Sequence, residues 1–274
     1  MKNYFTIVGL EAKSPFELSK ATSSPSFFIN NDSFAFFKKH NGVFVADPFV
    51  HVTNGREYLF CELLTEDNKH YKGIKGIIIK LERSKEDYEW SNPTVVLEEN
   101  FHVSYPSIYT YNNETFMLVE TAEINDVRIY KSNDTELNSW SFFKVILNGK
   151  YFDPTIFEFQ KNWFMFVCTG KSFSVLELYF SKNLFGPWTK HPKSPLKSDS
   201  SSSRPAGPIL EWDNKLYRLA QDCSIRYGQS VKAFEITTLS KEDYEEKEIG
   251  IILTESNNGW NSYGMHHLQV YKKK

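Results

Sequence analysis

A proline begins a predicted β-hairpin four times along this chain. The prolines are Pro48, Pro106, Pro154 and Pro208, which are 58, 48 and 54 residues apart. In each repeat an apolar run follows the proline, polar turn residues come next, and a second aromatic-rich run ends fourteen positions after the proline. Three of the turns are Asn54-Gly55, Asn112-Asn113 and Asp213-Asn214, whose residues tolerate the positive φ of tight hairpin turns. The sequence therefore predicts four hairpins of similar length.

A hairpin repeat of about 50 residues is typical of a β-propeller, because one small sheet cannot bury both of its faces without neighbours. A fifth inner strand is expected at residues 263–270, one repeat after Pro208. The aromatic runs within residues 25–37 are available to complete that blade. We therefore expect an all-β, five-bladed β-propeller that occupies residues 1–274 as a single domain. Its last blade is expected to be closed by the N- and C-terminal strands, which removes an exposed sheet edge.

Composition and charge argue against several classes of partner. The net charge is −2 and the basic residues are scattered, so the basic footprint of a nucleic-acid-binding protein is missing. No apolar run approaches the roughly 18 residues of a membrane span. The three cysteines form no C-x-x-C pair, which favours a reducing, cytoplasmic location. No nucleotide-binding or zinc motif occurs, so we expect neither a cofactor nor a metal.

Hairpin geometry predicts where the polar residues of the repeats meet. A residue just before each proline should lie opposite the residue fourteen positions after it, and opposed residues project to one face. The predicted pairs are Asp47 with Glu62, Tyr105 with Glu120, Asp153 with Cys168, and Gly207 with Asp222. His266 takes the corresponding place in the fifth blade. We therefore expect five carboxylates and His266 to surround one mouth of the propeller channel.

A second set of residues lies four positions before each proline: Phe44, His102, Lys150 and Arg204. His102 is expected to contact a sugar hydroxyl or to bond a loop carbonyl. Arg204 presents a planar fork suited to phosphate or carboxylate. An ion pair with Asp222 or Glu120 is an equally open interpretation of Arg204.

Paired carboxylates indicate a specific chemistry. Two carboxylates a few ångströms apart resist simultaneous ionisation, so one of Asp47 and Glu62 is expected to have a raised pKa. Glycoside cleavage uses such a pair, with one carboxyl donating a proton while the other attacks or activates water. An aspartate before a proline also often only caps a turn, and that alternative stays open for each acid taken alone.

Several of these residues also carry a family resemblance. The matching segments are residues 102–106, 204–208, 221–223, 227–228 and 264–267, together with Glu120 and Arg218. They resemble the N-terminal domain family of glucosamine inositolphosphorylceramide transferases, which has bacterial members. Ala46-Asp47-Pro48 and Gly186-Pro187-Trp188 are more distantly similar to the five-bladed propellers of glycoside hydrolase families 43 and 32. The resemblance implies a carbohydrate-active propeller associated with glycan assembly.

The chain departs from the hydrolase pattern at two blades. Those hydrolases place Asp, Asp and Glu at the starts of the first three blades, whereas this chain has Asp47, Tyr105 and Asp153. The second acid is missing and the third is shortened. Glu120, predicted to lie opposite Tyr105, is the candidate that restores a carboxylate to the second blade.

The sequence thus predicts a glycoside-processing enzyme that acts on a sugar or sugar conjugate in cell-surface polysaccharide synthesis. Asp47 is expected to be the base or nucleophile, Glu120 the general acid, and Asp153 a charge that orients substrate and tunes the pKa of the acid. The expected substrate-binding residues are Glu62, His102, Tyr105, Lys150, Arg204, Gln221, Asp222, Tyr227 and His266.

The expected partner is a saccharide or sugar conjugate, which bears phosphate if Arg204 and Lys150 hold an activated donor. A partner enzyme of glycan biosynthesis is expected beside it. Two other functions remain open. One is a non-catalytic glycan-binding module that presents saccharide to such an enzyme. The other is a glycosyl or acyl transferase that uses an activated donor.

Overall fold

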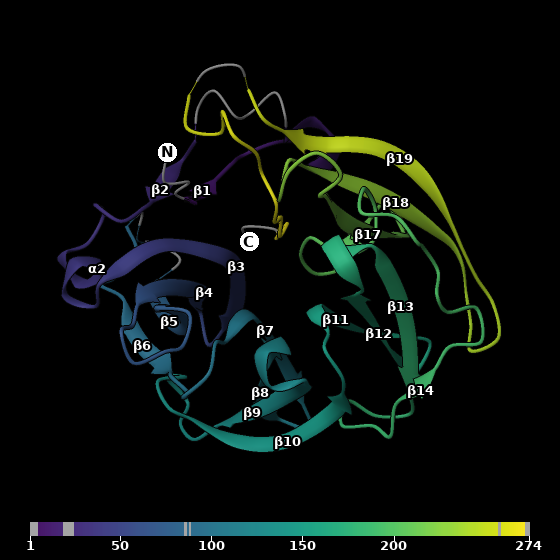
Figure 1. Cartoon of the computed structure of the whole chain (residues 1–274), viewed down its shortest axis with the longest axis horizontal. Helices are drawn as coiled ribbons and strands as arrows, with labels where there is room; N and C mark the ends of the chain where they lie inside the picture. Colours follow the sequence, from purple (N-terminus) through teal and green to yellow (C-terminus); the bar gives the residue numbers. More distant parts are fainter. Residues whose placement is uncertain (1–4, 19–24, 85–86, 88, 257–258, 272–274) are drawn as a thin grey trace. The chain divides into compact units, whose positions relative to one another are not determined.

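The computed structural model describes residues 5–18, 25–84, 87, 89–256 and 259–271. The chain divides into two compact units. The first unit comprises residues 1–9 and 25–149, and the second comprises residues 10–24 and 150–274. The described residues of both units are mainly antiparallel strands (Figure 1).

The first unit contains two four-stranded sheets in simple up-and-down order. The first sheet consists of β3 (Gly42–Thr53), β4 (Arg56–Glu66), β5 (Ile74–Ser84) and β6 (Thr94–Leu97). The second consists of β7 (Ser104–Tyr111), β8 (Glu114–Thr121), β9 (Asp126–Ser132) and β10 (Trp140–Asn148). Smaller elements are β1 (Ile7–Gly9), β2 (Phe27–Ile29), α2 (Ala35–Lys39) and the 3-10 turn η2 (Ala122–Ile124).

The second unit also contains two antiparallel sheets, one of four strands and one of five. One sheet consists of β11 (Phe152–Phe159), β12 (Asn162–Thr169), β13 (Val175–Ser181) and β14 (Thr189–Lys190). The other consists of β15 (Arg204–Pro205), β16 (Leu210–Trp212), β17 (Lys215–Asp222), β18 (Ser230–Leu239) and β19 (Tyr244–Thr254). Two 3-10 turns, η1 (Pro15–Glu17) and η3 (Lys171–Phe173), complete the unit.

The four predicted hairpins are confirmed. They are β3–β4, β7–β8, β11–β12 and β16–β17. Asn54 and Gly55 have φ of 50° and 75°, and Asp213 and Asn214 have φ of 50° and 57°. These are the left-handed conformations that two-residue hairpin turns require.

The predicted fifth blade is wrong: the described residues contain four such sheets. Residues 263–271 form no strand. Of the expected N-terminal hairpin, β2 pairs with β1, and residues 35–39 are helical. Phe34 and Phe37 pack edge to face at 5.6 Å, three residues apart as on one face of a helical turn. Phe37 belongs to the core of the first sheet, and Phe34 packs against that core. Helical spacing of the aromatics therefore overrides the strand pattern.

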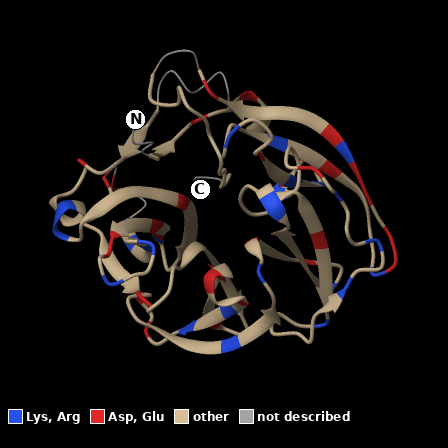
Figure 2. Ribbon diagram, viewed as in Figure 1, with Lys and Arg blue, Asp and Glu red and all other residues tan. Residues whose placement is uncertain are grey.

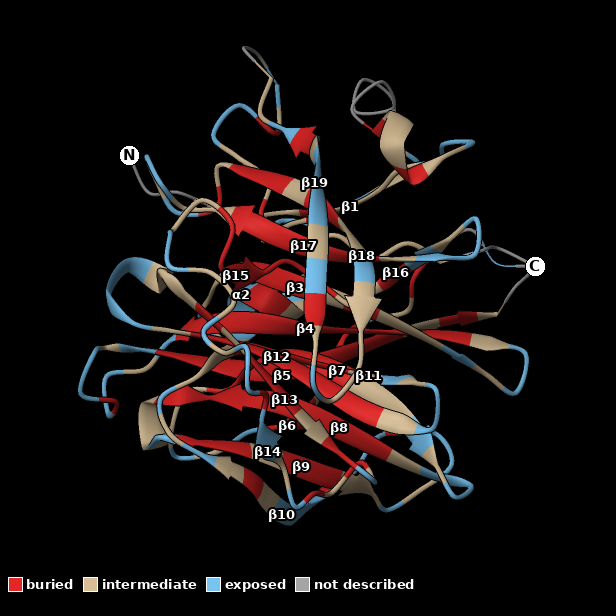
Figure 3. Ribbon diagram, turned by 90° about the vertical axis from the view of Figure 1, so that its right-hand side faces the viewer, coloured by how far each residue is buried: buried red, intermediate tan, exposed pale blue. Residues whose placement is uncertain are grey.

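The fourth sheet is covered by segments from both ends of the chain without a fifth sheet. Leu10, Phe16 and Leu18 pack into its core, as do Met265 and Leu268. The Leu268 N–H donates to the Ala206 carbonyl over 2.8 Å. Figure 3 shows that buried residues follow the strands of each sheet, whereas most exposed residues lie in the connections.

A β-bulge at the first three prolines makes the predicted cross-strand pairs wrong. Ala46 pairs with Glu62 and Phe49 with Phe60, so Asp47 and Pro48 together lie opposite one residue of β4. The same bulge occurs in β7 and β11, where Glu120 pairs with Ser104 and Cys168 with Phe152. Proline has no N–H to donate, so an unpaired bulge position accommodates it. In the fourth hairpin Gln221 pairs with Arg204, and the predicted pair of Gly207 with Asp222 is not formed.

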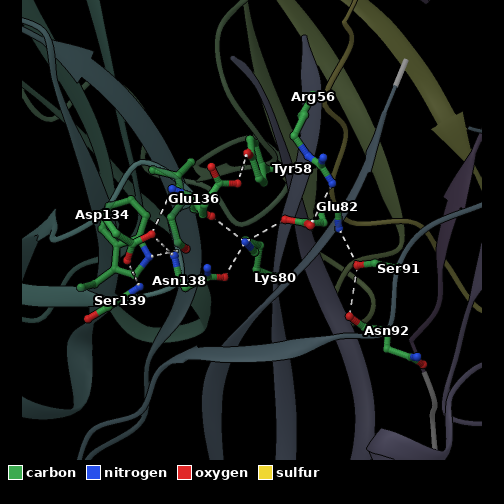
Figure 4. Close-up of polar contacts among 12 residues, drawn as sticks. Arg56, Tyr58, Lys80, Glu82, Ser91, Asn92, Asp134, Glu136, Asn138 and Ser139 are labelled. Carbon is green, nitrogen blue, oxygen red and sulfur yellow. Dashed lines mark hydrogen bonds and ion pairs between the residues drawn. The ribbon is translucent and has the colours of Figure 1, made fainter. Parts of the chain in front are cut away.

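A buried lysine links the two sheets of the first unit (Figure 4). Lys80 of β5 is 3% exposed. Its ammonium donates to Glu82 Oε2 at 3.0 Å, to the Glu136 carbonyl at 2.6 Å and to Asn138 Oδ1 at 2.7 Å. It also lies 5.0 Å from the centre of the Tyr58 ring. All three ammonium donors are therefore used, two of them on the loop between β9 and β10.

Candidate functional site

Three bulge residues adopt a strained backbone conformation. Asp47, Tyr105 and Asp153 have φ of 52°, 52° and 48°, in the left-handed region. That region is tolerable for aspartate and unfavourable for a bulky residue such as tyrosine. All three side chains are buried. Strained, non-glycine positions repeated at equivalent sites are candidates for function, because surrounding structure must hold them in place.

In the first unit, Asp47, Glu62 and His102 form what we call the acidic cluster. His102 Nε2 lies 3.4 Å from Glu62 Oε1. The pKa of the adjacent Cys61 thiol is raised, first by burial and then by the negative charges of Asp47 and Glu62. The charge of Asp47 also acts on His102. Two carboxylates and an imidazole that the sequence predicted as site residues thus lie together.

Gly76 of β5 allows the acidic cluster to close. A Cβ atom at Gly76 would lie 2.7 Å from Glu62 Oε1 and 2.8 Å from His102 Cε1. The Gly76 N–H donates to His102 Nδ1 over 3.0 Å. Glycine at this position therefore lets the backbone approach both side chains and orient the imidazole.

His102 is held as a neutral hydrogen-bond donor. Because Nδ1 accepts the Gly76 N–H, the ring proton lies on Nε2, which faces Glu62. The pKa of His102 is lowered from 6.5 to about 4, chiefly by burial, although Glu123 opposes the shift. At neutral pH His102 can thus donate a hydrogen bond to a carboxylate or a hydroxyl without carrying charge.

The lowered pKa of His102 predicts acid sensitivity. As pH falls below 6.5, the unfolded chain binds a proton at His102 before the folded chain does, so stability present above pH 6.5 is lost towards pH 4. We expect His102 to contribute up to about 3 kcal/mol of this loss. His102→Asn keeps an acceptor for the Gly76 N–H and should lose less stability between pH 7 and 4 in urea titrations. An equal loss of stability in His102→Asn and wild type would contradict this. The control variant His40→Asn should lose as much stability as wild type.

In the second unit, Asp153, Arg204 and Gln221 form a buried cluster that we call the arginine cluster. Arg204 Nε donates to Asp153 Oδ2 over 2.6 Å, and its Nη2 donates to Oδ1 over 3.1 Å. Gln221 Nε2 donates to Asp153 Oδ2 over 2.7 Å and to the Pro205 carbonyl over 2.8 Å. Arg204 thus pairs with Asp153, a partner that the sequence did not suggest.

Aromatic rings surround Arg204. Its guanidinium carbon lies 4.1 Å from the Phe173 ring centre and 4.8 Å from that of Tyr227. Tyr227 is 39% exposed, and its ring centre lies 5.6 Å from that of the buried His266. The arginine cluster therefore reaches the surface through Tyr227.

The remaining predicted residues have varied surroundings. Tyr105 is fully buried and packs edge to face on Phe49, with ring centres 4.9 Å apart. Glu120 is buried on β8. Lys150 is exposed, with its ammonium 5.9 Å from the Phe152 ring centre. Asp222 pairs with Lys232 at 3.1 Å.

Sequence reasoning missed residues that support both clusters. Glu123 lies in η2, where it accepts the main-chain N–H of His102 over 3.1 Å, and Phe173 lies in η3 beneath Arg204. Each follows the second strand of its hairpin. Their shared position after that strand is the sequence signal that points to them.

Charge is mixed in both units. Figure 2 shows Lys and Arg spread over many elements and interspersed with Asp and Glu. Among the residues that the structure describes, no group of three or more His, Cys, Asp and Glu side chains is arranged to hold a metal ion. The described helices are all too short or too polar to cross a membrane.

Solved structures with similar folds define the fold class as a β-propeller. The catalytic domain of a family 62 α-L-arabinofuranosidase from Coprinopsis cinerea matches with a TM-score of 0.60 and 10% identity, covering 86% of this chain and 84% of that one. A family 117 glycoside hydrolase from Zobellia galactanivorans matches with a TM-score of 0.58 and 10% identity, covering 91% of this chain and 74% of that one.

Sequence similarity defines the family. The model described as glucosamine inositolphosphorylceramide transferase 1, N-terminal, matches residues 22–274, and the chain belongs to this family. The predicted resemblance is thereby confirmed. Glucosamine inositolphosphorylceramide transferase 1 of Oryza sativa subsp. japonica is 30% identical over 237 residues, covering 83% of this chain and 31% of the relative. The protein of that name from Arabidopsis thaliana is 31% identical, covering 83% and 30%. The chain thus spans about a third of the length of these relatives.

Proposed function

We propose that this chain is carbohydrate-active and processes a glycosidic linkage in a sugar or sugar conjugate during glycan assembly. The observation that carries the proposal is the acidic cluster, in which a strained bulge brings Asp47 close to Glu62 and His102. Two kinds of similarity support it: the relatives are named for glucosamine transfer, and the structural neighbours are glycoside hydrolases.

Asp47 is the proposed base or nucleophile, and the left-handed bulge fixes the direction of its carboxylate. Glu120, buried at the equivalent strand end of the second sheet, is the proposed general acid. His102 and Glu62 are proposed to bind sugar hydroxyls, because a neutral imidazole donor and a carboxylate acceptor suit such groups.

We propose that Asp153 positions Arg204 and does not contact the substrate itself. Its carboxylate already accepts hydrogen bonds from Arg204 and Gln221. We propose that it holds Arg204 flat between Phe173 and Tyr227, where the guanidinium and the exposed ring contribute to recognition of the saccharide. Gln221 and His266 then support this surface, and Lys150 is proposed to bind an anionic part of the substrate.

The second candidate function is a glycan-binding module that presents saccharide to a partner enzyme. The bulge positions favour it, because Tyr105 occupies one of them and the aspartate of another is engaged by Arg204. Of the three bulge positions, 47, 105 and 153, only position 47 then has a carboxylate that lies outside the arginine cluster.

Measurements on the wild-type protein distinguish the two functions. The protein should be incubated with glucosamine-terminated oligosaccharides and glycolipids, with and without a sugar-phosphate donor. Mass spectrometry then detects cleavage or transfer, and calorimetry measures affinity. Turnover supports the proposed enzyme. Saturable affinity without turnover moves the assignment to the binding module, and the absence of both overturns the carbohydrate assignment.

A further inference from the structure

The turn between β4 and β5, residues 67–73, is closed by its own hydrogen bonds. The Asp67 N–H donates to the Gly73 carbonyl over 3.0 Å, and the Gly73 N–H donates to the His70 carbonyl over 2.8 Å. Asp67 Oδ1 accepts the Lys69 N–H over 2.9 Å. These hydrogen bonds fix the backbone conformation of the turn.

His70 anchors this turn to the acidic cluster through one carboxylate. His70 Nε2 lies 2.8 Å from Glu123 Oε1, and Glu123 Oε2 accepts the main-chain N–H of His102 over 3.1 Å. Although burial opposes ionisation, these hydrogen bonds lower the pKa of Glu123. Glu123 thus fixes the turn and His102 to the same point.

The tautomer of His70 agrees with an anchoring role. His70 Nδ1 accepts the Lys72 N–H over 3.3 Å, so the ring proton lies on Nε2 and is donated to Glu123. The His70 side chain is 4% exposed. A buried imidazole with both nitrogens engaged holds the two residues that follow it in a fixed direction.

Those two residues are Tyr71 and Lys72. Tyr71 is 74% exposed, and its ring rests against that of His70 with the centres 4.6 Å apart. The Lys72 ammonium lies 5.2 Å from the Tyr71 ring centre. The positive charge of Lys72 contributes to lowering the pKa of both His102 and Glu123, as expected for a cation beside the acidic cluster.

We propose that Tyr71 and Lys72 form a recognition rim for the acidic cluster and select a sugar that carries an anionic group. The ring of Tyr71 packs against the apolar face of the pyranose, and Lys72 pairs with the phosphate or carboxylate. A cation is needed there because Asp47 and Glu62 would otherwise repel an anionic ligand. The inference rests on the proposed function, since it names the substrate class of the same site.

Calorimetric titration with glucosamine, glucosamine 6-phosphate and glucuronic acid tests this rim. Wild type should bind the anionic sugars about tenfold more tightly than glucosamine, and Lys72→Gln should reduce that preference to about twofold or less. Lys69→Gln, in the same turn, should keep the preference. Tyr71→Ala should lower the affinity for all three sugars by a similar factor. Inorganic phosphate as a competitor should reduce the preference for both anionic sugars, because both are proposed to pair with Lys72.

Two results would overturn the rim. One is a wild type with no preference for anionic sugars, and the other is a preference that survives Lys72→Gln. Either result leaves the proposed function standing if a neutral glycan is turned over or bound at the acidic cluster. If Glu62→Gln loses affinity for every sugar while Lys72→Gln binds each sugar as wild type does, the sugar binds at the acidic cluster without contacting the rim.

Discussion

Replacing Asp47 by Asn is expected to lower turnover of the true substrate by at least about 100-fold while the fold and most sugar affinity persist. The change is nearly isosteric, and asparagine tolerates the left-handed conformation found at Asp47. An amide, however, can neither accept a proton nor attack as a carboxylate does. Turnover by mass spectrometry and affinity by calorimetry should be measured on the same preparation.

Asp213→Asn is the matched control for Asp47→Asn. Asp213 also has φ near 50°, but it lies exposed in the turn between β16 and β17. This variant should keep wild-type turnover. If Asp47→Asn remains active, Asp47 is neither base nor nucleophile, and that role moves to Glu62.

Replacing Lys80 by Met is expected to lower the free energy of unfolding by about 2–3 kcal/mol. The substitution removes the donor that Glu82, the Glu136 carbonyl and Asn138 share. Glu82 keeps its ion pair with Arg56, and residues 136 and 138 are exposed, so the loss is that of the three hydrogen bonds of the lysine. Urea titration monitored by tryptophan fluorescence gives the value, because Trp140 lies in the same core as Tyr58.

Lys131→Met is the control for Lys80→Met. Lys131 lies on β9 of the same unit and pairs with Glu114 at the surface, where both side chains are more than a third exposed. Its loss should cost less than about 1 kcal/mol. Equal effects of the two substitutions would show that the buried lysine does not stabilise the junction of the two sheets.

The hairpins could be predicted because their determinants are local. Asn54 and Gly55 adopt positive φ with little steric cost, and alternating apolar residues on either side define the strands. The same reasoning placed Asp47 close to Glu62, since the ends of two paired strands bring these residues together even when the register differs by one. It put His102 in a separate set of residues and did not predict that His102 lies against Glu62.

The register itself could not be predicted from spacing. A bulge adds one unpaired residue to a strand, and the prolines that mark it are equally compatible with a regular strand start. The pairing of Asp153 with Arg204 could not be predicted either, because Arg204 is 51 residues away in the sequence and belongs to another sheet. The fifth blade failed for a third reason, since the spacing of Phe34 and Phe37 fits a helical turn and the core of the first sheet accepts them there.

In the three left-handed bulges, the strand pairing that fixes the backbone is independent of which side chain occupies the strained position. The conformation at residues 47, 105 and 153 accompanies the same bulged pairing in the three hairpins, with paired residues on either side of the bulge. The side chain at the strained position takes little part in that pairing, so aspartate and tyrosine occupy it in turn. A single codon change at such a position can therefore exchange an acid for a packing residue while strand pairing stays the same, and a lineage built on this hairpin can gain or lose a reactive group without having to evolve a new fold.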